Sequence, residues 1–524
     1  MSQIKLFRTD DFTGGLNLRA DPFQLGQNES PDLLNVDVDP RGGFAIRKGF
    51  ERANASAIGS IAAASFTPEK LFHWKGSSSQ LLVAANSKVF YSTDTSTYTD
   101  TTIATTHAEG CSFAPWTSSS TKFVYCAVGR SSAQMAKWSG AAKTMLTASA
   151  TGQWQESLGT PTGTHMPKAD LACTHVDRMW VASTNEDATD YVNRIRFSHP
   201  NFPESWRSAD YIDIPGGGSG ITAIVPWGDA LIVFKKGAVW ALYGVDTATF
   251  QLVQIATTLG AETSHCVAST EHGLYFFSWP DGVFLWDGSK LSDVFNGLRP
   301  MLEDVNTAKL DQVWLSSVNY KVWLSLPMNT ETTPSVTYVY DRTINAWTRH
   351  QLADGRGFAA ATDFVRSTGA RYVIGLHPTE PYALKENLTT WTDNISGTPA
   401  NYSSYYITRW VDGGLISAKK MWRQPDFVLK QPTTDLTLTV DVYRDWEEEN
   451  ARRNYTMVVG GSGAGMVWGN NWGSNWGSAA VGSQYQKGQR LGLSRAVQLK
   501  VAGPGGRDWG INSITYKYNQ RRIR

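Results

Sequence analysis

The sequence is poor in cysteine, in charge and in long apolar runs. Among its 524 residues there are four cysteines, and none of them forms a C-x-x-C pair. A disulfide framework is therefore not expected, and the cysteines predict a reduced protein made in the cytosol. No apolar run approaches the roughly 18 residues that a transmembrane helix needs, and the first residues lack the apolar stretch of a secretion signal. We expect neither a membrane span nor a signal peptide.

Catalytic and nucleotide-binding motifs are also missing. The sequence has no G-x-S-x-G, H-E-x-x-H, P-loop or G-x-G-x-x-G pattern. A glycine-rich stretch at 214–224 lacks the lysine of a phosphate loop. Ser92 and Asp94 begin a sialidase-like box, but Ser96 stands in place of its glycine and Thr99 in place of its tryptophan. The sequence thus predicts no catalytic, cofactor-binding or metal-binding residues, and a protein that is not an enzyme.

The first recognisable pattern in the sequence is that of a short hairpin near the start of the chain. In residues 33–50, LLNVDVDPRGGFAIRKGF, Val36 and Val38 alternate with polar residues before a Pro-Arg-Gly-Gly turn. Phe44 and Ile46 then alternate in the same way. Alternation with period two on both sides of a glycine-rich turn predicts two paired strands.

The same stretch has the acidic spacing of a calcium loop. A calcium loop needs glycine at its sixth position and glutamate at its twelfth. With Asn35 as the first position, these places hold Pro40 and Ile46. We therefore expect Asn35, Asp37 and Asp39 to line one solvated strand face, without a cation.

Most of the chain consists of short alternating runs bounded by turn residues, and helical periodicity is scarce. One short helix is expected around 300–310. Glycine (47 residues) and tryptophan (21 residues) are abundant, which suits an all-β protein with many turns. A strand–turn–strand unit recurs about every 40–55 residues, the spacing of propeller blades. The copies lie at 80–94, 121–140, 177–198, 229–244, 272–291 and 319–352. They predict a β-propeller of about six blades over residues 55–395, preceded by an N-terminal arm and hairpin at 1–54.

Residues 396–524 have a different pattern and predict a C-terminal β-sandwich. Strands are expected at about 402–410, 425–430, 435–444, 455–459, 494–502 and 511–518. Between them lies a Gly/Trp-rich loop, 460–478, in which Trp468, Trp472 and Trp476 recur with a period of four. Glycine follows each tryptophan, which disfavours a helix. Exposed tryptophans often mark protein contacts, so these three are candidate interface residues. The alternative is that the indoles fold back onto the sandwich.

Charge is unevenly distributed along the chain. Residues 451–524 carry 11 Lys and Arg against one acidic residue, Asp508, whereas the preceding 450 residues carry 37 basic and 46 acidic residues. The net charge of +1 gives the whole chain no electrostatic case for binding nucleic acid. The basic C-terminal part either contacts an anionic partner or forms a solvated surface.

The N-terminal fifty residues resemble the start of nozzle proteins (tail tubular protein B) of short-tailed double-stranded DNA bacteriophages. The matching residues are Gly14-Gly15, Asp21-Pro22, Gln27-Asn28, Asn35, Gly42-Gly43, Arg47 and Gly49-Phe50. Later stretches at 221–244 and 272–288, and the closing segment that begins at 497, are similar to phage propeller proteins in pattern more than in motif. The resemblance covers most of the chain.

This resemblance implies a structural virion protein of a phage tail. It would form a homo-oligomeric ring, a hexamer in that family, below the portal and adaptor, with contacts to tail-fibre or tail-tip proteins. Phage DNA would pass through the ring during ejection without specific binding. The protein would be assembled in the cytoplasm of the bacterial host and would reside in the virion.

Two other functions stay open at this stage. The chain is shorter than many nozzle proteins, so it could be a minor tail, tail-tip or receptor-binding protein of a long-tailed phage. A propeller enzyme that cuts host surface glycans is the third possibility. That enzyme would need a carboxylate-lined pocket at the propeller axis.

Overall fold

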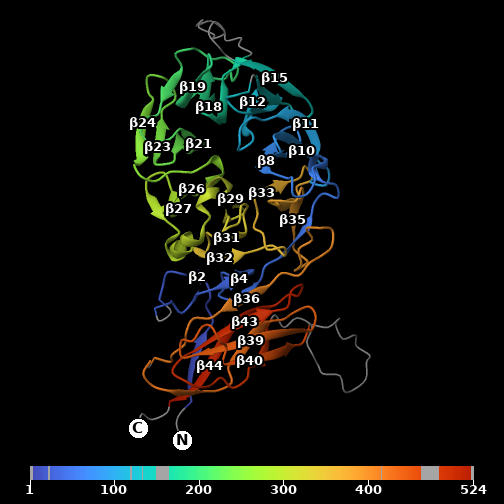
Figure 1. Ribbon diagram of the computed structural model, residues 1–524, viewed down its shortest axis with the longest axis vertical. Helices are drawn as coiled ribbons and strands as arrows, with labels where there is room; N and C mark the ends of the chain where they lie inside the picture. The colour runs from blue at the N-terminus through green and yellow to red at the C-terminus, as the bar shows by residue number, and fades with distance from the viewer. Residues whose placement is uncertain are drawn as a thin grey trace.

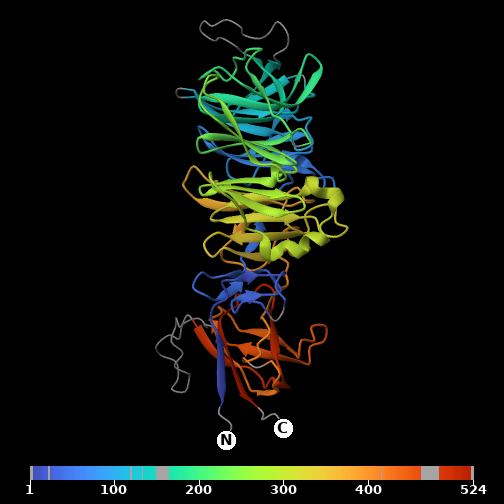
Figure 2. The ribbon, with the colours of Figure 1, turned by 90° about the vertical axis from the view of Figure 1, so that its left-hand side faces the viewer.

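A computed structural model describes residues 4–21, 24–118, 121–132, 134–148, 165–216, 218–414, 416–461 and 483–520. The molecule is elongated, with a disc of radially arranged sheets at one end and a smaller two-sheet body at the other (Figure 1). Seen from the side, the two-sheet body continues from the rim of the disc, and the N-terminal segment lies between them (Figure 2). No helix among the described residues is long and apolar enough to cross a membrane.

The disc is a β-propeller. Seven sheets, each of four or five strands and antiparallel except for the parallel pair of β15 and β16, follow one another around it in the described part of the chain. The first blade contains β8 (Pro68–Lys75), β9 (Ser79–Ala85), β10 (Lys88–Ser92) and β11 (Thr99–Ala104), and the second contains β12 (Ser112–Ser118), β13 (Thr121–Ala127), β14 (Gln134–Trp138), β15 (Lys143–Ala148) and β16 (His165–Met166). The third contains β17 (Lys168–His175), β18 (Arg178–Glu186), β19 (Thr189–Phe197) and β20 (Tyr211–Asp213), and the fourth contains β21 (Ile221–Trp227), β22 (Ala230–Lys235), β23 (Ala238–Tyr243) and β24 (Gln251–Ala256).

The remaining three blades complete the ring. The fifth contains β25 (Val267–Thr270), β26 (Gly273–Ser278), β27 (Gly282–Trp286) and β28 (Leu291–Asp293), and the sixth contains β29 (Trp314–Val318), β30 (Lys321–Leu326), β31 (Val336–Asp341) and β32 (Ala346–His350). The seventh contains β33 (Ala360–Val365), β34 (Arg371–Leu376), β35 (Ala383–Asn387) and β7 (Gly49–Arg52). The first strands of successive blades contact one another, and β33 returns to β8, which closes the circle.

The all-β propeller with a C-terminal sandwich, predicted from sequence, is confirmed, and the number of blades needs correction from about six to seven. The sequence copies account for the first six blades. The seventh was missed because it is assembled from distant parts of the chain. Its outermost strand, β7, pairs Phe50 with Glu386 and Arg52 with Leu384. A sheet edge that is filled in this way leaves no open end in the ring.

The smaller body is a β-sandwich whose core lies between its two sheets. One sheet has five strands, β4 (Leu33–Leu34), β36 (Ser404–Ile407), β43 (Val497–Gly503), β39 (Leu436–Arg444) and β40 (Arg453–Val459). The other contains β41 (Ser483–Lys487), β38 (Asp426–Lys430), β44 (Gly510–Gln520), β37 (Lys420–Trp422) and β42 (Gly492–Ser494), together with β1 (Lys5–Thr9), β5 (Val36–Val38) and β6 (Phe44–Ile46). Strands therefore form at all six places expected from sequence.

The N-terminal segment belongs to both bodies. The predicted hairpin is present, with Val36 opposite Ile46 and Val38 opposite Phe44, and β6 also pairs antiparallel with β44 of the sandwich. Three residues after β6, strand β7 enters the propeller. A parallel pair, β2 (Gly15–Leu16) and β3 (Glu29–Ser30), lies against β32. The hairpin is thus the place where the chain passes from one body to the other.

Helical structure in the described residues is limited to short 3₁₀ segments. The helix expected around 300–310 is found as two such segments, η3 and η4, interrupted after Asp304. The segments are η1 (Ile58–Ser60), η2 (Ser264–Cys266), η3 (Asn296–Asp304) and η4 (Thr307–Gln312). All four cysteines are buried free thiols.

Candidate functional site

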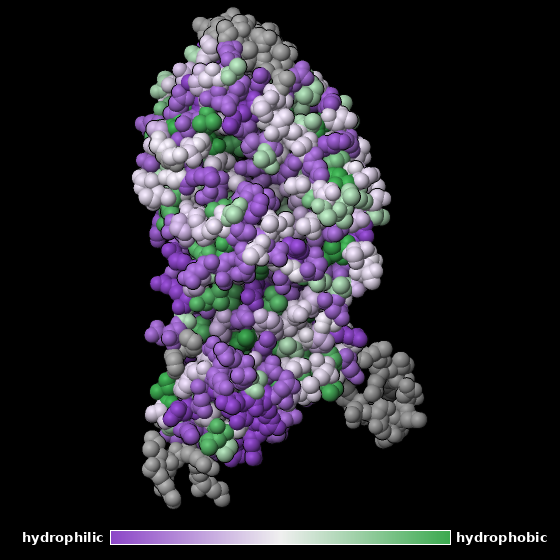
Figure 3. Space-filling view, viewed as in Figure 1, coloured by the Kyte–Doolittle hydropathy of each residue, from purple (hydrophilic) through white to green (hydrophobic). Residues whose placement is uncertain are grey.

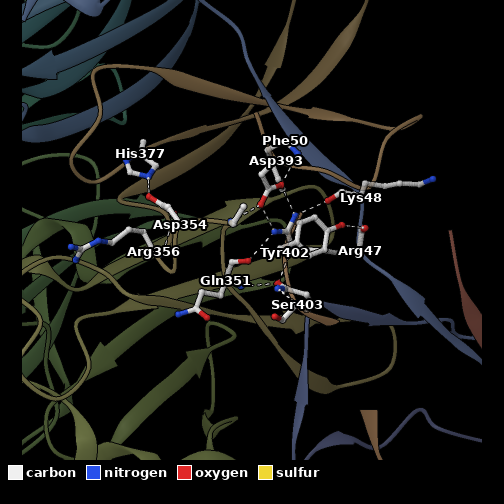
Figure 4. A network of polar contacts seen from close by, with 12 residues as sticks. Arg47, Lys48, Phe50, Gln351, Asp354, Arg356, His377, Asp393, Tyr402 and Ser403 are labelled. Atoms are coloured by element: carbon white, nitrogen blue, oxygen red, sulfur yellow. Dashed lines mark hydrogen bonds and ion pairs between the residues drawn. The ribbon is translucent and has the colours of Figure 1, made fainter. Parts of the chain in front are cut away.

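A buried polar network lies between the propeller and the sandwich and centres on Arg47 (Figure 4). Its guanidinium forms a bidentate pair with Asp393, at 3.0 and 2.6 Å, and both side chains are almost fully buried. The Nε–H donates to Asn35 Oδ1 at 2.9 Å, and the remaining N–H groups donate to the carbonyl oxygens of Lys48 and Gln351, each at 2.8 Å. Every donor of this buried arginine is therefore satisfied.

The partners of Arg47 are equally well satisfied. The Asp393 carboxylate also accepts the backbone N–H of Phe50 and of Ala353, each at 3.0 Å. The Tyr402 ring lies over the guanidinium at 3.8 Å, and its hydroxyl donates to the Arg47 carbonyl at 2.6 Å. We call Asn35, Arg47, Gln351, Asp393 and Tyr402 the joint. A buried ion pair that is hydrogen-bonded in this way is specific in geometry and costly to break.

Two glycines of the N-terminal segment are needed where the backbone packs closely around the joint. Gly42, in the hairpin turn, has φ +110°, and a Cβ there would lie 2.5 Å from the Asp10 carbonyl oxygen. At Gly49 a Cβ would lie 2.0 Å from the Thr392 carbonyl oxygen. Larger side chains cannot occupy either position without moving the backbone. Gly42 and Gly49, two of the residues that carry the resemblance to the phage proteins, are thus explained by local packing.

Beside the joint is a cavity of about 280 Å³ between the hairpin and blades six and seven. Asp37 enters it from the hairpin and pairs with Lys321 Nζ at 2.9 Å and with His350 Nε2 at 3.4 Å. Burial raises the pKa of Asp37, but Lys321 and His350 outweigh that effect and hold the pKa far below its usual value. Glu386 and Lys48 also line the cavity, and burial raises the pKa of Glu386 and lowers that of Lys48.

The expectation of a solvated face at Asn35, Asp37 and Asp39 is wrong. Asn35 is 1% exposed and lies in the joint, and Asp37 faces the propeller. Asp39 alone of the three has an exposed partner, Arg41. Apolar and polar residues alternate along the strand as expected. The polar face, opposite the sandwich core, is however covered by the propeller. Among the described residues no group of three or more ligating side chains could hold a metal ion.

A second polar cluster lies on the propeller axis, where the first strands of the blades begin. Lys70 on β8 donates from Nζ to Ser264 Oγ at 3.0 Å, across the ring from blade one to blade five. The backbone N–H of Ser264 donates to Glu109 Oε2 at 2.9 Å. His265 stacks on Trp314, with ring centroids 3.8 Å apart. Side chains from four blades therefore meet at this end of the axis.

Charge in the axial cluster is suppressed by burial. Glu69, next to Lys70 in β8, makes its contacts within blade one: its carboxylate accepts hydrogen bonds from Ser87 N–H and Thr105 Oγ1, and burial raises its pKa to about 7. Burial, with the nearby charge of Lys70, lowers the pKa of His265 far below its usual value, and its Nδ1 is buried without a partner. A carboxyl group with a pKa near neutrality can hold or release a proton under physiological conditions. Sequence reasoning missed this cluster because its members lie in four separate blades.

The other sequence candidates have different outcomes. Trp468, Trp472 and Trp476 lie outside the described residues, so their role as interface residues stays a prediction. Ser92 and Asp94 belong to a tight turn, where Ser92 Oγ donates to Asp94 and the carboxylate accepts the N–H of Ser96. That pattern stabilises a turn and does not form a glycosidase site.

No family model matches the sequence, and no curated protein sequence matches it. Among solved structures, a streptogramin B lyase is similar over 63% of this chain and 95% of its own, with 13% identity and a TM-score of 0.38. A catalytically inactive virginiamycin B lyase from Staphylococcus aureus, with quinupristin, is similar over 63% of this chain and 97% of its own, with 11% identity and a TM-score of 0.39. The extracellular domain of a hybrid two-component system from B. thetaiotaomicron covers 74% of this chain, with 43% of its own length, 9% identity and a TM-score of 0.38.

These structures correct one prediction from the sequence. The chain was predicted not to be an enzyme, but two of the similar structures are lyases. At these identities the likeness concerns the propeller fold alone, and no substrate is transferred to this chain.

Proposed function

We propose that the protein is a structural component of a bacteriophage tail, in which copies of the chain form a ring below the portal and adaptor. The proposal rests on the resemblance of the N-terminal segment to nozzle proteins. Its main support is the joint, because Asn35, Arg47, Gly49 and Phe50, which carry the resemblance, hold the propeller and the sandwich together. A ring subunit under the load of DNA ejection needs such a rigid connection.

The test is the oligomeric state and shape of the purified chain. Mass photometry and negative-stain microscopy should show closed rings with six copies, and antibodies against the chain should label the tail of virions near the head. Monomers at every concentration, or labelling at the distal tip of a long tail, would contradict the proposal. In that case the chain would be a tail-tip or receptor-binding protein.

The proposed ring should include the Gly/Trp-rich loop in its contacts. Replacing Trp468, Trp472 and Trp476 together by serine should abolish ring formation, since aromatic side chains carry much of the energy of protein interfaces. The melting temperature of the isolated subunit should stay unchanged, which separates lost assembly from misfolding. Rings that form normally from this variant would show that the loop is not an interface.

The proposed ring should let DNA pass without holding it. Each lysine or arginine that pairs with a phosphate releases counterions and strengthens binding, so several in the bore would retain a duplex. We therefore expect the bore to be neutral or acidic and the basic part of the sandwich to face elsewhere. Titration of rings with a short duplex at several salt concentrations tests this. Tight binding with a steep salt dependence at physiological salt would place the basic residues in the bore.

A further inference from the structure

The end of the sandwich farthest from the propeller holds an arginine whose position is unusual. In β39 the side chains of Leu436, Leu438, Val440 and Val442 alternate inward and are buried. Arg444 is the next residue in this inward series. Its guanidinium reaches the opposite sheet, where a Cβ on Gly492 would lie 2.6 Å from Nη2 and 2.8 Å from Cζ. The cationic group thus lies between the two sheets, at the open end of their core.

This guanidinium has no partner. Within the described ranges, no hydrogen bond, ion pair or aromatic contact involves the Arg444 side chain, and its Nε–H is buried without an acceptor. By contrast, Arg47 at the other end of the sandwich uses every donor. A buried N–H without an acceptor is costly, and a bound water or ion is one physical explanation for it.

The neighbouring charges increase that cost. Burial and the positive charges of Arg453 and Arg452 lower the pKa of Arg444, and Asp445 opposes them only in part. The nearby acidic groups are engaged elsewhere, since Asp445 accepts the backbone N–H of Arg495 and Glu447 pairs with Arg452. On the side shown in Figure 3, hydrophilic side chains cover most of the sandwich.

We propose that Arg444, with the neighbouring Arg453, binds a phosphate-like oxyanion at the distal end of the sandwich. Arg453 already donates to the Arg490 carbonyl at 2.8 Å and to Gln489 Oε1 at 2.6 Å, so it contributes positive charge while Arg444 contributes the unpaired donors. An oxyanion accepts several N–H groups at once, matches the planar guanidinium and would balance the unpaired charge of Arg444. The site is independent of the ring proposed above, because it needs one subunit only.

The probe is inorganic phosphate, compared with sodium chloride at equal ionic strength. Calorimetric titration should show one bound phosphate per chain, and phosphate should raise the melting temperature. Arg444→Met should weaken phosphate binding by at least about tenfold, as expected when a charge-assisted bidentate contact is lost. The phosphate affinity of Arg444→Lys should lie between those of the wild type and Arg444→Met, because an ammonium group keeps the charge without the planar donors.

Arg507→Met is the matched control. Arg507 is an exposed arginine of the same sandwich, and its side chain donates a hydrogen bond to Thr434 Oγ1. The Arg507→Met variant should bind phosphate with an affinity within about twofold of the wild type. Should Arg444→Met fail to fold, Arg453→Met replaces it and should weaken binding by several-fold. Equal phosphate affinity in the wild type and the Arg444 variants would overturn the proposal. So would wild-type protein that binds a short DNA duplex but shows no response to inorganic phosphate.

Discussion

The joint and the axial cluster bury polar groups in opposite ways. In the joint, Arg47 and Asp393 stay paired, and every donor and acceptor has a partner. At the propeller axis burial lowers the pKa of His265, and within blade one burial raises the pKa of Glu69 to about 7, so these groups tend to lose their charge. A buried charge is tolerated where an opposite charge meets it with good geometry, and elsewhere the neutral form is favoured. The first arrangement connects two bodies rigidly, and the second leaves a group that titrates near neutral pH.

Breaking the ion pair of the joint should have the largest effect. Arg47→Met leaves the Asp393 carboxylate buried without its cation, so we expect a loss of about 3–5 kcal/mol in the free energy of unfolding. Thermal unfolding should also separate into two transitions, because the propeller and sandwich would no longer unfold together. Calorimetry measures both effects.

The double variant sharpens this result. Arg47→Met combined with Asp393→Leu removes both charges, and replacing a whole buried pair by apolar groups is much less costly than breaking it. We expect the double variant to be clearly more stable than Arg47→Met alone. Additive losses in a double-mutant cycle would mean that the two residues do not act as a pair.

Removing the ion pair between Asp37 and Lys321, which lies beside the joint, should lower the free energy of unfolding by a smaller amount. That loss should depend on pH. Asp37→Asn should cost about 1–2 kcal/mol at pH 7, because 35% of the Asp37 side chain is exposed and solvent screens its pair with Lys321. The pKa of Asp37 is lowered in the folded state, so its contribution is present above the unfolded pKa and is lost as the pH falls. Urea unfolding from pH 7 to pH 3 should therefore show the variant and the wild type converging in acid.

The carboxyl group of Glu69 should show the opposite dependence of stability on pH and the smallest effect on the free energy of unfolding. The pKa of Glu69 is raised to about 7, so its ionisation costs stability as the pH rises from about 4.5 to 7. Glu69→Gln keeps an acceptor for Ser87 and cannot ionise. We expect it to gain about 1 kcal/mol over the wild type at pH 8 and nothing at pH 4. An equal difference at both pH values would show that Glu69 titrates normally in the folded protein.

Local patterns in the sequence were sufficient for most of the fold. Alternation at Val36, Val38, Phe44 and Ile46 predicts the hairpin, and the strand–turn–strand copies predict a propeller. These predictions succeed because a strand shows its buried face in its own residues. The seventh blade did not follow from this pattern, since β7 and β35 are separated by more than 300 residues.

The sites depended on contacts that no local pattern shows. Asp37 has the alternation of a solvated strand residue, and only the approach of β30 and β32 pairs it with Lys321 and His350 and partly covers it. Arg47 precedes its partner Asp393 by 346 positions. Likewise, the guanidinium of Arg444 lies against Gly492 because two sheets end at the same place. By itself the sequence determined the type of each element and its apolar face, because these follow from neighbouring residues. Only the tertiary structure decided which charges are paired, neutral or unpaired, because pairing depends on distance in space.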